Sequence, residues 1–252
     1  MIKFFRKIRQ QLLKENRFSK YMLYALGEII LVVIGILIAL AISNWNETQK
    51  SKKLEQQLLH ALLAEFESNL QLLNDVIALN NSNIENSILL GEYTGPSVTN
   101  IHEKELSERM VGIFKIEPRY LPNQGTVQEI INSGRLSVLS DDKLRKALSA
   151  WQSGLESVKR QENYVVERRD IGHDFFLKEG NFRRHLDLIN DALLDPTPSK
   201  FPNNDFKFLE NQEFESQLYL FIVASRNLNV VFYEPLRERI NTIIALIKND
   251  IQ

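Results

Sequence analysis

Apolar residues fill one unbroken stretch near the start of the chain and afterwards recur at helical spacing. The stretch 21–42 is apolar on every face of a helix except the face that carries Glu28. As a helix it would be about 33 Å long, enough to cross a hydrocarbon core of about 30 Å. From residue 47 onward, apolar positions return every three or four residues with polar positions between them, which is typical of amphipathic helices.

Gly and Pro divide the rest of the chain into a series of helices. No Gly or Pro interrupts residues 47–90, so this helix can continue directly from the apolar stretch. Pro235 is expected to kink or divide the last helix, because proline removes a backbone donor and clashes with the preceding turn. The pattern predicts helices over residues 47–90, 103–114, 126–132, 140–178, 183–194 and 213–248. No stretch alternates as a strand would, so we predict an all-α fold with one N-terminal transmembrane helix and an antiparallel helical-bundle ectodomain.

The apolar stretch is predicted to insert into a membrane despite its acid. Thirteen of its residues are Leu, Ile or Val, which together favour insertion by about 4 to 8 kcal/mol, whereas one central charge costs about 3 kcal/mol. A cleaved signal peptide is the competing interpretation, because Ala39-Leu40-Ala41 has the spacing of a cleavage site. The apolar run is longer than that of a signal peptide, and a helix-forming sequence follows it. We therefore predict a retained anchor.

Charge predicts the orientation of this anchor. The first 20 residues carry seven basic side chains and one acid, whereas only three lysines closely follow the stretch. The positive-inside bias places residues 1–20 in the cytoplasm and residues 43–252 in the periplasm, as in a single-pass protein of a bacterial inner membrane. Tyr21 and Tyr24 at one end and Trp45 at the other are the predicted interfacial anchors. The basic residues that set the topology are Lys3, Arg6, Lys7, Arg9, Lys14, Arg17 and Lys20.

The basic tip at residues 1–20 has a pattern of its own. Met1, Phe4, Ile8 and Leu12 recur at about helical spacing, with basic residues between them. This spacing predicts a short amphipathic helix on the cytoplasmic leaflet of the lipid bilayer, attracted by anionic lipid at about 1 kcal/mol per basic residue. The alternative is a disordered basic flank that only sets the topology.

Composition narrows the possible partners. From Leu54 onward the chain has 21 Lys and Arg against 29 Asp and Glu, a net charge of −8. An acidic body of this kind would repel phosphate, so we do not expect nucleic acid as a partner. The chain has no cysteine, which excludes disulfides, thiolate catalysis and cysteine-ligated metals.

The sequence contains no recognisable motif for catalysis or for cofactor binding. It lacks the Walker A, G-x-S-x-G and G-x-G-x-x-G patterns, and no two histidines have a spacing typical of metal ligands. The segments Arg183-Arg184-His185 and Arg168-Arg169 could bind an anion or a lipid headgroup, but we interpret them as parts of solvated helix faces. We therefore predict no catalytic residue, no cofactor and no metal, and a protein that is not an enzyme. The four histidines are His60, His102, His173 and His185.

Several blocks of the sequence resemble the signature of a known family. Those in the first 47 residues are the basic opening FFRKIR, Asn16, Ser19-Lys20-Tyr21, the block Tyr24–Ile29, the block Val33–Leu40 and Asn44-Trp45-Asn46. They resemble the N-terminal signature of DUF6090, a family of unknown function that is common in Bacteroidota, and EIINSGRLSVLSDDKLRKALSAW resembles the core of its ectodomain. The resemblance implies a single-span envelope protein with a helical ectodomain, and it places Glu28 inside the family's motif. It implies no activity.

Glu28 lies on an ordered face of the predicted transmembrane helix. Gly35 and Ala39 share this face as a small-xxx-small pair, which lets two helices approach closely. A protonated Glu28 could donate a hydrogen bond to the neighbouring helix. The face is therefore predicted to pack against a second copy of the chain or against another membrane helix. The alternative is that Glu28 lies near enough to the headgroups to reach them without a partner.

These features favour a non-enzymatic anchor protein whose helical bundle binds or scaffolds an unidentified envelope protein. Two other functions stay open. The order of basic tip, acidic span and outer domain is also similar to that of ExbD, TolR and MotB, accessory subunits of proton-driven complexes. In that case Glu28 would carry the proton, although the acid here is a Glu and no peptidoglycan-binding motif is visible. The ectodomain could instead sense a ligand and signal through a partner.

Overall fold

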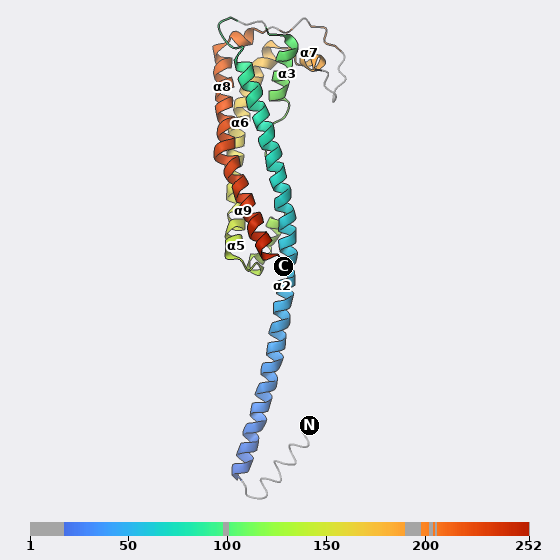
Figure 1. Cartoon of the computed structure of the whole chain (residues 1–252), viewed down its shortest axis with the longest axis vertical. Helices are drawn as coiled ribbons and strands as arrows, with labels where there is room; N and C mark the ends of the chain where they lie inside the picture. Colours follow the sequence, from blue (N-terminus) through green and yellow to red (C-terminus); the bar gives the residue numbers. More distant parts are fainter. Residues whose placement is uncertain (1–17, 98–100, 190–197, 202–203, 205, 252) are drawn as a thin grey trace. The chain divides into compact units, whose positions relative to one another are not determined.

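The computed structural model describes residues 18–97, 101–189, 198–201, 204 and 206–251. These residues form helices and no strand, which confirms the prediction of an all-α fold. The chain divides into two compact units, residues 1–56 and residues 57–252. The α-helices shown in Figure 1 are α2 (Phe18–Gly91), α3 (Glu103–Phe114), α4 (Gly125–Asn132), α5 (Asp142–Ser149), α6 (Trp151–Glu179), α7 (Phe182–Leu188), α8 (Gln212–Asn227) and α9 (Glu234–Asp250). Shorter pieces are the 3₁₀ turns η1 (Arg135–Val138) and η2 (Lys207–Glu210) and the π-helical turn η3 (Leu228–Tyr233).

Helix α2 joins the apolar stretch to the first amphipathic helix. It continues for 74 residues from Phe18 to Gly91, so the predicted continuity is confirmed. Its apolar part is long and hydrophobic enough, by length and composition, to cross a membrane, and it is the single such helix in the described part of the chain. The physical reason for the unbroken helix is the absence of Pro throughout and of Gly between positions 36 and 90.

The second unit is built from the part of α2 after residue 56, from α6, and from the α8–α9 pair, which lie side by side (Figure 1). The side-chain amide of Asn80 on α2 donates to the carbonyl oxygen of Ser225 on α8 (2.9 Å). Farther back along α2, Glu67 pairs with Lys248 on α9 (2.8 Å). Residue numbers thus fall on α2 as they rise along α8 and α9, so these helices are antiparallel.

Helix α6 runs in the same direction as α2. Near its start Trp151 packs edge-on against Phe66 of α2, with ring centroids 5.0 Å apart. Near its end Phe175 packs against Phe214 at the start of α8, at 5.8 Å. The segment that contains α3, α4, η1 and α5 connects α2 to α6. Helices α2 and α6 are therefore parallel to each other, and both are antiparallel to the α8–α9 pair.

Two helices contribute buried seams in which the steps alternate between three and four residues. This 3.5-residue spacing is the one that lets helices pack along a shallow crossing. Polar residues occupy several seam positions and are buried there like their apolar neighbours. The seam of α2 consists of Leu59, Leu62, Phe66, Asn69, Leu73, Val76, Asn80, Asn83, Ser87 and Leu90. The seam of α6 consists of Trp151, Leu155, Val158, Glu162, Val165, Arg169, Gly172 and Phe176.

The single helix predicted over residues 140–178 is two helices in the structure. It begins where expected, since the Asp141 side chain accepts a hydrogen bond from the backbone N–H of Lys143 (2.6 Å) as an N-cap. The helix then breaks at Ala150. The break lets α5 pack against α9 while α6 packs against α8, and these tertiary contacts are not visible in a local pattern.

The predicted division of the last helix at Pro235 is confirmed. Helix α8 ends at Asn227, a π-helical turn occupies residues 228–233, and Pro235 lies in the first turn of α9. Because proline has no N–H, an α-helix here would leave one carbonyl of the preceding turn without its donor, and a wider turn relieves the crowding. The π-helical turn also directs Tyr233 into the core, where it is fully buried.

Candidate functional site

The predicted membrane face lies on one helix with an exposed surface. All described side chains from Met22 to Lys50 are exposed except Ala25 and Glu28, which are half-buried. Glu28, Gly35 and Ala39 are seven and four residues apart on α2, a spacing that keeps them on one face. The structure therefore brings these three predicted residues together on a helix face.

Other predicted residues of this region fall outside what the structure describes. Lys3, Arg6, Lys7, Arg9, Lys14 and Arg17 precede its first described residue, and the side chains of Lys20, Tyr21 and Tyr24 are likewise outside the described set. Their assignment to lipid contact and to the interface stays a prediction. Trp45 is described and is 65 % exposed.

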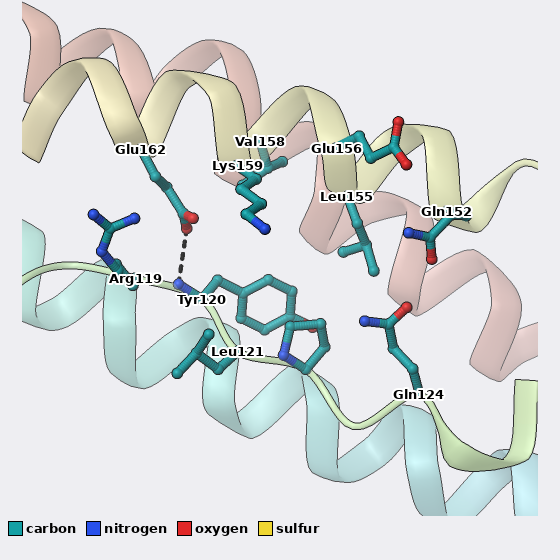
Figure 2. A pocket seen from close by; sticks show the side chains of 11 residues that line it. Arg119, Tyr120, Leu121, Gln124, Gln152, Leu155, Glu156, Val158, Lys159 and Glu162 are labelled. Atoms are coloured by element: carbon teal, nitrogen blue, oxygen red, sulfur yellow. Dashed lines mark hydrogen bonds between the residues drawn. The ribbon is translucent and has the colours of Figure 1, made fainter. Parts of the chain in front are cut away.

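A hollow of about 320 Å³ lies between α6 and the loop that precedes α4 (Figure 2). The loop contributes Arg119, Tyr120, Leu121, Pro122 and Gln124 to its lining. Helix α6 contributes Gln152, Leu155, Glu156, Val158, Lys159 and Glu162. The lining therefore combines an apolar surface with both signs of charge, and its volume is at the small end of ligand sites.

Buried Glu162 fixes the loop to the bundle. Its carboxylate accepts a hydrogen bond from the backbone N–H of Tyr120 (2.8 Å) and one from the Tyr233 hydroxyl (2.7 Å). Tyr233 comes from the π-helical turn, so the carboxylate links the loop, α6 and η3 (Figure 2 shows the contact with Tyr120). Burial raises the pKa of Glu162, and burial also raises the pKa values of Tyr120 and Tyr233.

Helix α2 holds the other side of the same loop. Asn69 exchanges two hydrogen bonds with the backbone of Asn123: its side-chain amide donates to the carbonyl oxygen (2.8 Å) and its Oδ1 accepts from the N–H (2.7 Å). One turn earlier, Glu65 accepts hydrogen bonds from the backbone N–H groups of Thr126 (2.6 Å) and Val127 (3.3 Å), which caps α4. The hollow thus has a loop wall whose backbone is fixed on two sides.

Arg119 and Lys159 supply the positive charge of the hollow. Arg119 donates to Glu117 (2.6 Å) and to the side-chain oxygen of Asn163 (2.8 Å), which leaves part of its guanidinium available. Lys159 forms no hydrogen bond or ion pair with any residue that the structure describes, although its charge acts on Glu162 and opposes the rise of that pKa. Gln124 adds a buried Oε1 that has no hydrogen-bond partner among the described residues.

The sequence analysis interpreted two basic segments as solvated helix faces. In the structure Arg169 and Arg184 are buried or partly buried, so the interpretation was wrong for these two residues. Arg169 is only 5 % exposed and donates to the carbonyl oxygens of Ile113 and Phe114, which closes the C-terminus of α3. Arg184 forms a bidentate pair with Glu103, at 2.6 Å for one of its two bonds. The hydrogen bond from Arg184 holds the pKa of the Glu103 carboxyl below its usual range. Both arginines are therefore occupied in holding helices together.

His185 is fully buried beside this pair. Its Nδ1 lies 2.6 Å from the Ser107 hydroxyl oxygen, and its ring packs on Phe176 with centroids 4.4 Å apart. Burial lowers the pKa of His185 to about 4, so the imidazole is neutral at neutral pH. A Ser–His contact can activate a nucleophile, but both side chains here are 0 % exposed and no substrate reaches them in this structure. The contact is a packing element of α3 and α7.

A third feature is an apolar stripe on the surface of α8 and η3. Leu220, Val223, Val230 and Val231 follow one another along one side of these helices and are between 37 % and 69 % exposed. Single exposed apolar residues are common, but four within twelve positions of α8 and η3 form an apolar stripe, which the exposed Arg226 and Asn227 interrupt. No group of three or more His, Asp or Glu side chains in the described ranges is placed to hold a metal ion.

The sequence analysis predicted a membrane face on α2, which stays a prediction, and missed the hollow. Glu162, the buried acid of the hollow, continues the spacing of Leu155 and Val158 along α6. This spacing was the signal in the sequence that could have predicted its burial. Lys159 and Gln124 carried no such signal, because only the tertiary fold brings the loop before α4 against α6.

Comparison with known proteins gives one match. The model of the family described as "Family of unknown function (DUF6090)" matches residues 28–155, which include Glu28, the seam of α2, the loop before α4 and the start of α6. No curated protein matches the chain. No solved structure matches it either.

Proposed function

Because the chain belongs to DUF6090, a family of unknown function, we propose its function from its own residues: a single-span, self-associating anchor protein that is not an enzyme. Residues 1–20 lie in the cytoplasm, and residues 43–252 form a periplasmic bundle at a bacterial inner membrane that binds or scaffolds an envelope protein. The exposed apolar surface of α2 supports the anchor. Seven basic residues before the stretch, against three lysines behind it, support the orientation.

The observation that carries self-association is the open space at Gly35. Apart from its chain neighbours and the backbone of its own helix turn, a Cβ added there would meet no atom of the described residues within 4 Å. Nothing within one copy therefore requires glycine at this position, whereas a second helix could use the missing side chain to approach closely. Ala39 and Glu28 lie on the same face, so we propose that two copies pack along it, with another membrane helix as the competing occupant.

We expect Gly35→Ile to weaken self-association of the full-length protein about tenfold, because the new side chain separates the two helices. Gly27→Ile is the matched control. Gly27 also has no atom within 4 Å of an added Cβ, but it lies about 100° around the helix from Glu28. Energy transfer between labelled copies in lipid vesicles measures the association, and equal effects of the two substitutions would contradict the proposed face.

The apolar stripe of α8 supports a second contact between the same two copies. Copies tethered in one bilayer have a high effective concentration, so a weak apolar contact outside the membrane suffices for pairing. A two-fold arrangement would place the stripe of one copy against the stripe of the other, because such an interface uses the same surface twice. Arg226 is exposed between Val223 and Val230 along the chain, so it would lie near its symmetry mate, and the like charges of the two arginines would oppose this contact.

The variant Arg226→Cys tests this contact without interference, since the natural chain contains no cysteine. We expect it to form a disulfide-linked dimer in membranes, and we expect Val223→Gln combined with Val230→Gln to slow that cross-linking severalfold. Leu177→Gln, which changes an exposed apolar residue of α6, is the control and leaves the rate unchanged. If Arg226→Cys fails to cross-link while Gly35→Ile still weakens self-association, the two copies contact each other through the transmembrane helix alone.

A second candidate function is ligand sensing, and the hollow beside α6 is the observation that favours it. Its wall includes Glu162, which also bonds Tyr233 of the π-helical turn. A bound molecule that altered the surroundings of Glu162 would therefore act on the packing of α6 against η3. Sensing and self-association are compatible in one chain.

A further inference from the structure

The hollow between α6 and the loop before α4 extends along α6. Its lining residues on this helix run from Gln152 to Glu162, a length of about 15 Å along the helix axis. The loop runs beside them in the opposite direction (Figure 2). At one end Tyr120 of the loop donates its N–H to Glu162, and at the other end Gln124 faces Gln152. An occupant of the hollow therefore lies lengthwise between the helix and the loop, and its two ends meet different side chains.

The middle of the hollow is apolar. Leu155 and Val158 of α6 form one side of it, and Leu121 and Pro122 of the loop form the other. Leu121 is 77 % exposed although its neighbour Tyr120 is buried, so the loop holds an apolar side chain at the mouth of the hollow. A chain of methylene groups would remove this apolar surface from water, which favours an occupant with an aliphatic middle part.

Lys159 places a positive charge at one end of the apolar section. Its side chain extends from α6 toward the loop, between Glu162 and Leu155 (Figure 2). Arg119, the other cation of the lining, already donates to two side chains, whereas Lys159 forms no hydrogen bond or ion pair with a residue that the structure describes. A lysine ammonium is a compact charge that pairs readily with a carboxylate. The group of the occupant that matches this end is therefore a carboxylate.

The two acids of the lining leave this position open. The Oε1 atom of Glu162 accepts hydrogen bonds from Tyr120 and Tyr233. Because Lys159 lies between Glu162 and the apolar section, a carboxylate on that section would meet the ammonium before it meets the acid (Figure 2). The side chain of Glu156 is exposed and points away from the loop. Neither acid therefore takes the place of an anionic occupant.

The other end of the hollow presents two side-chain amides. Gln124 extends from the loop toward Gln152 of α6 (Figure 2). The Oε1 atom of Gln124 is buried, so the amide presents its nitrogen to the hollow. An amide N–H and an amide oxygen that lie close together match a hydroxyl group, which accepts one hydrogen bond and donates another. This end is therefore suited to a neutral hydroxyl and not to a second charge.

The separation of the two polar ends limits the shape of the occupant. Lys159 and Gln152 are seven residues apart on α6, which is about 10 Å along the axis. The volume of about 320 Å³ corresponds to about ten waters, so the occupant has roughly ten non-hydrogen atoms. A carboxylate and a hydroxyl can reach the two ends only if they lie at opposite ends of an unbranched chain of about six carbons.

The loop is held in place independently of any occupant. Asn69 binds the backbone of Asn123, and Glu162 binds the backbone N–H of Tyr120. A wall that is already ordered loses little conformational entropy when a molecule binds. This order favours affinity even for a small and flexible ligand.

We propose that this hollow binds an aliphatic carboxylate that carries a hydroxyl at the far end of its chain. The carboxylate pairs with Lys159, the methylene groups cover Leu155 and Leu121, and the hydroxyl bonds the amides of Gln124 and Gln152. Binding is the input of the ligand-sensing function named above, on which this proposal rests, and it is independent of self-association. A chain that binds no such acid can still pair through its transmembrane helix, so the two proposals fail separately.

Isothermal titration of the full-length protein in mild detergent measures binding, with 6-hydroxyhexanoate as the probe. Two analogues each lack one polar end: hexanoate has no hydroxyl, and hexane-1,6-diol has no carboxylate. We expect 6-hydroxyhexanoate to bind with a dissociation constant below about 1 mM and each analogue to bind about tenfold more weakly. No binding of 6-hydroxyhexanoate at about 10 mM would overturn the proposal. Equal binding of the diol would overturn the carboxylate assignment, and equal binding of hexanoate would overturn the hydroxyl assignment.

Lys159→Met supplies the second arm of the test. The residue is exposed on α6, so the change leaves the core intact. We expect about a tenfold loss of affinity for 6-hydroxyhexanoate and no change for hexane-1,6-diol, because the diol has no charge to pair with the ammonium. Arg160→Met is the matched control, since it removes a positive charge from the adjacent exposed position, which does not line the hollow. Equal loss for both probes, or equal effects of the two substitutions, would overturn the assignment of Lys159.

Hydrogen exchange of residues 228–233 tests sensing separately from binding. Glu162 lines the hollow and accepts a hydrogen bond from Tyr233 in this π-helical turn, so we expect 6-hydroxyhexanoate to change the exchange of the turn. Binding that leaves this exchange unchanged would support the site and contradict the sensing function.

Discussion

Asn69→Leu is expected to lower the free energy of unfolding by about 3 kcal/mol, whereas Asn83→Leu raises it by about 1 kcal/mol. Both asparagines belong to the seam of α2, both are 0 % exposed, and the same substitution is made at each. They differ in their hydrogen bonds. Asn69 exchanges two with the backbone of Asn123, at 2.8 and 2.7 Å, so leucine would remove both and leave a backbone donor and acceptor unpaired.

Asn83 is the opposite case. Neither its amide nitrogen nor its side-chain oxygen has a hydrogen-bond partner among the described residues. A buried polar group without partners costs about 1–3 kcal/mol, and leucine of similar size removes that cost while adding apolar burial. The hydrogen bond from the Ser87 hydroxyl to the backbone carbonyl oxygen of Asn83 (2.7 Å) does not depend on the Asn83 side chain, so it survives the substitution.

Urea unfolding of the full-length protein in mild detergent, followed by circular dichroism, measures both changes. The denaturant slope should be equal in all three chains, so that shifts in midpoint report stability alone. Loss of stability in both variants would mean that Asn83 has partners in solution that replace its missing contacts. A gain in both would mean that the Asn69–Asn123 bonds contribute little.

The two seams also show how far the sequence could predict this fold. Apolar spacing was enough to locate the helices, because burial of one face is what makes an amphipathic helix stable in a bundle. The same spacing runs through Asn69, Asn83 and Glu162, but a reading limited to apolar residues passes over them. The helical spacing of the position, rather than the polarity of its side chain, was the signal that predicts burial, and it would have placed Glu162 in the core.

The remaining features depend on contacts between distant segments. The break at Ala150 arises because α5 and α6 pack on different helices, and nothing in the local sequence near it is a helix breaker. His185 follows two arginines and looks solvent-facing, yet it is fully buried, with contacts to Ser107 of α3 and Phe176 of α6. The hollow at Lys159 has the same origin, because its loop wall is at least 28 residues away along the chain from the lining residues of α6 and meets them only through the fold. The shared face of Glu28, Gly35 and Ala39 could be predicted from spacing because these residues lie on one continuous helix, whereas its contact with a second helix stays a prediction.

The stability of the second unit is expected to fall as the pH drops from about 6.5 to about 4, and His185 is the main cause. Burial lowers the pKa of His185 from its ordinary 6.5 to about 4. Between these values the unfolded chain binds a proton that the folded chain excludes, so protonation favours unfolding there. The full stabilisation is present above pH 6.5, and about 3 kcal/mol of it is lost by pH 4.

Two other groups contribute to the pH dependence. Burial lowers the pKa of His173, which adds a loss in the same direction. Burial raises the pKa of Glu162, so its contribution has the opposite sign: it is present below the ordinary pKa of a glutamate and is lost as the pH rises through the raised value. Arg184 and Glu103 flank His185 with opposite charges, and their effects on its pKa oppose each other.

The variant His185→Asn measures how much His185 contributes to the pH dependence of the free energy of unfolding. Asparagine can still bond the Ser107 hydroxyl but cannot take up a proton, so the variant should be less stable at pH 7 and should lose most of the pH dependence between 6.5 and 4. His60→Asn is the control, because His60 is exposed on α2 and its replacement should leave the slope unchanged. Urea midpoints measured across this pH range give the slope directly. A slope that persists in His185→Asn would assign the pH dependence to the other buried groups, because the slope reports proton uptake and not the overall stability.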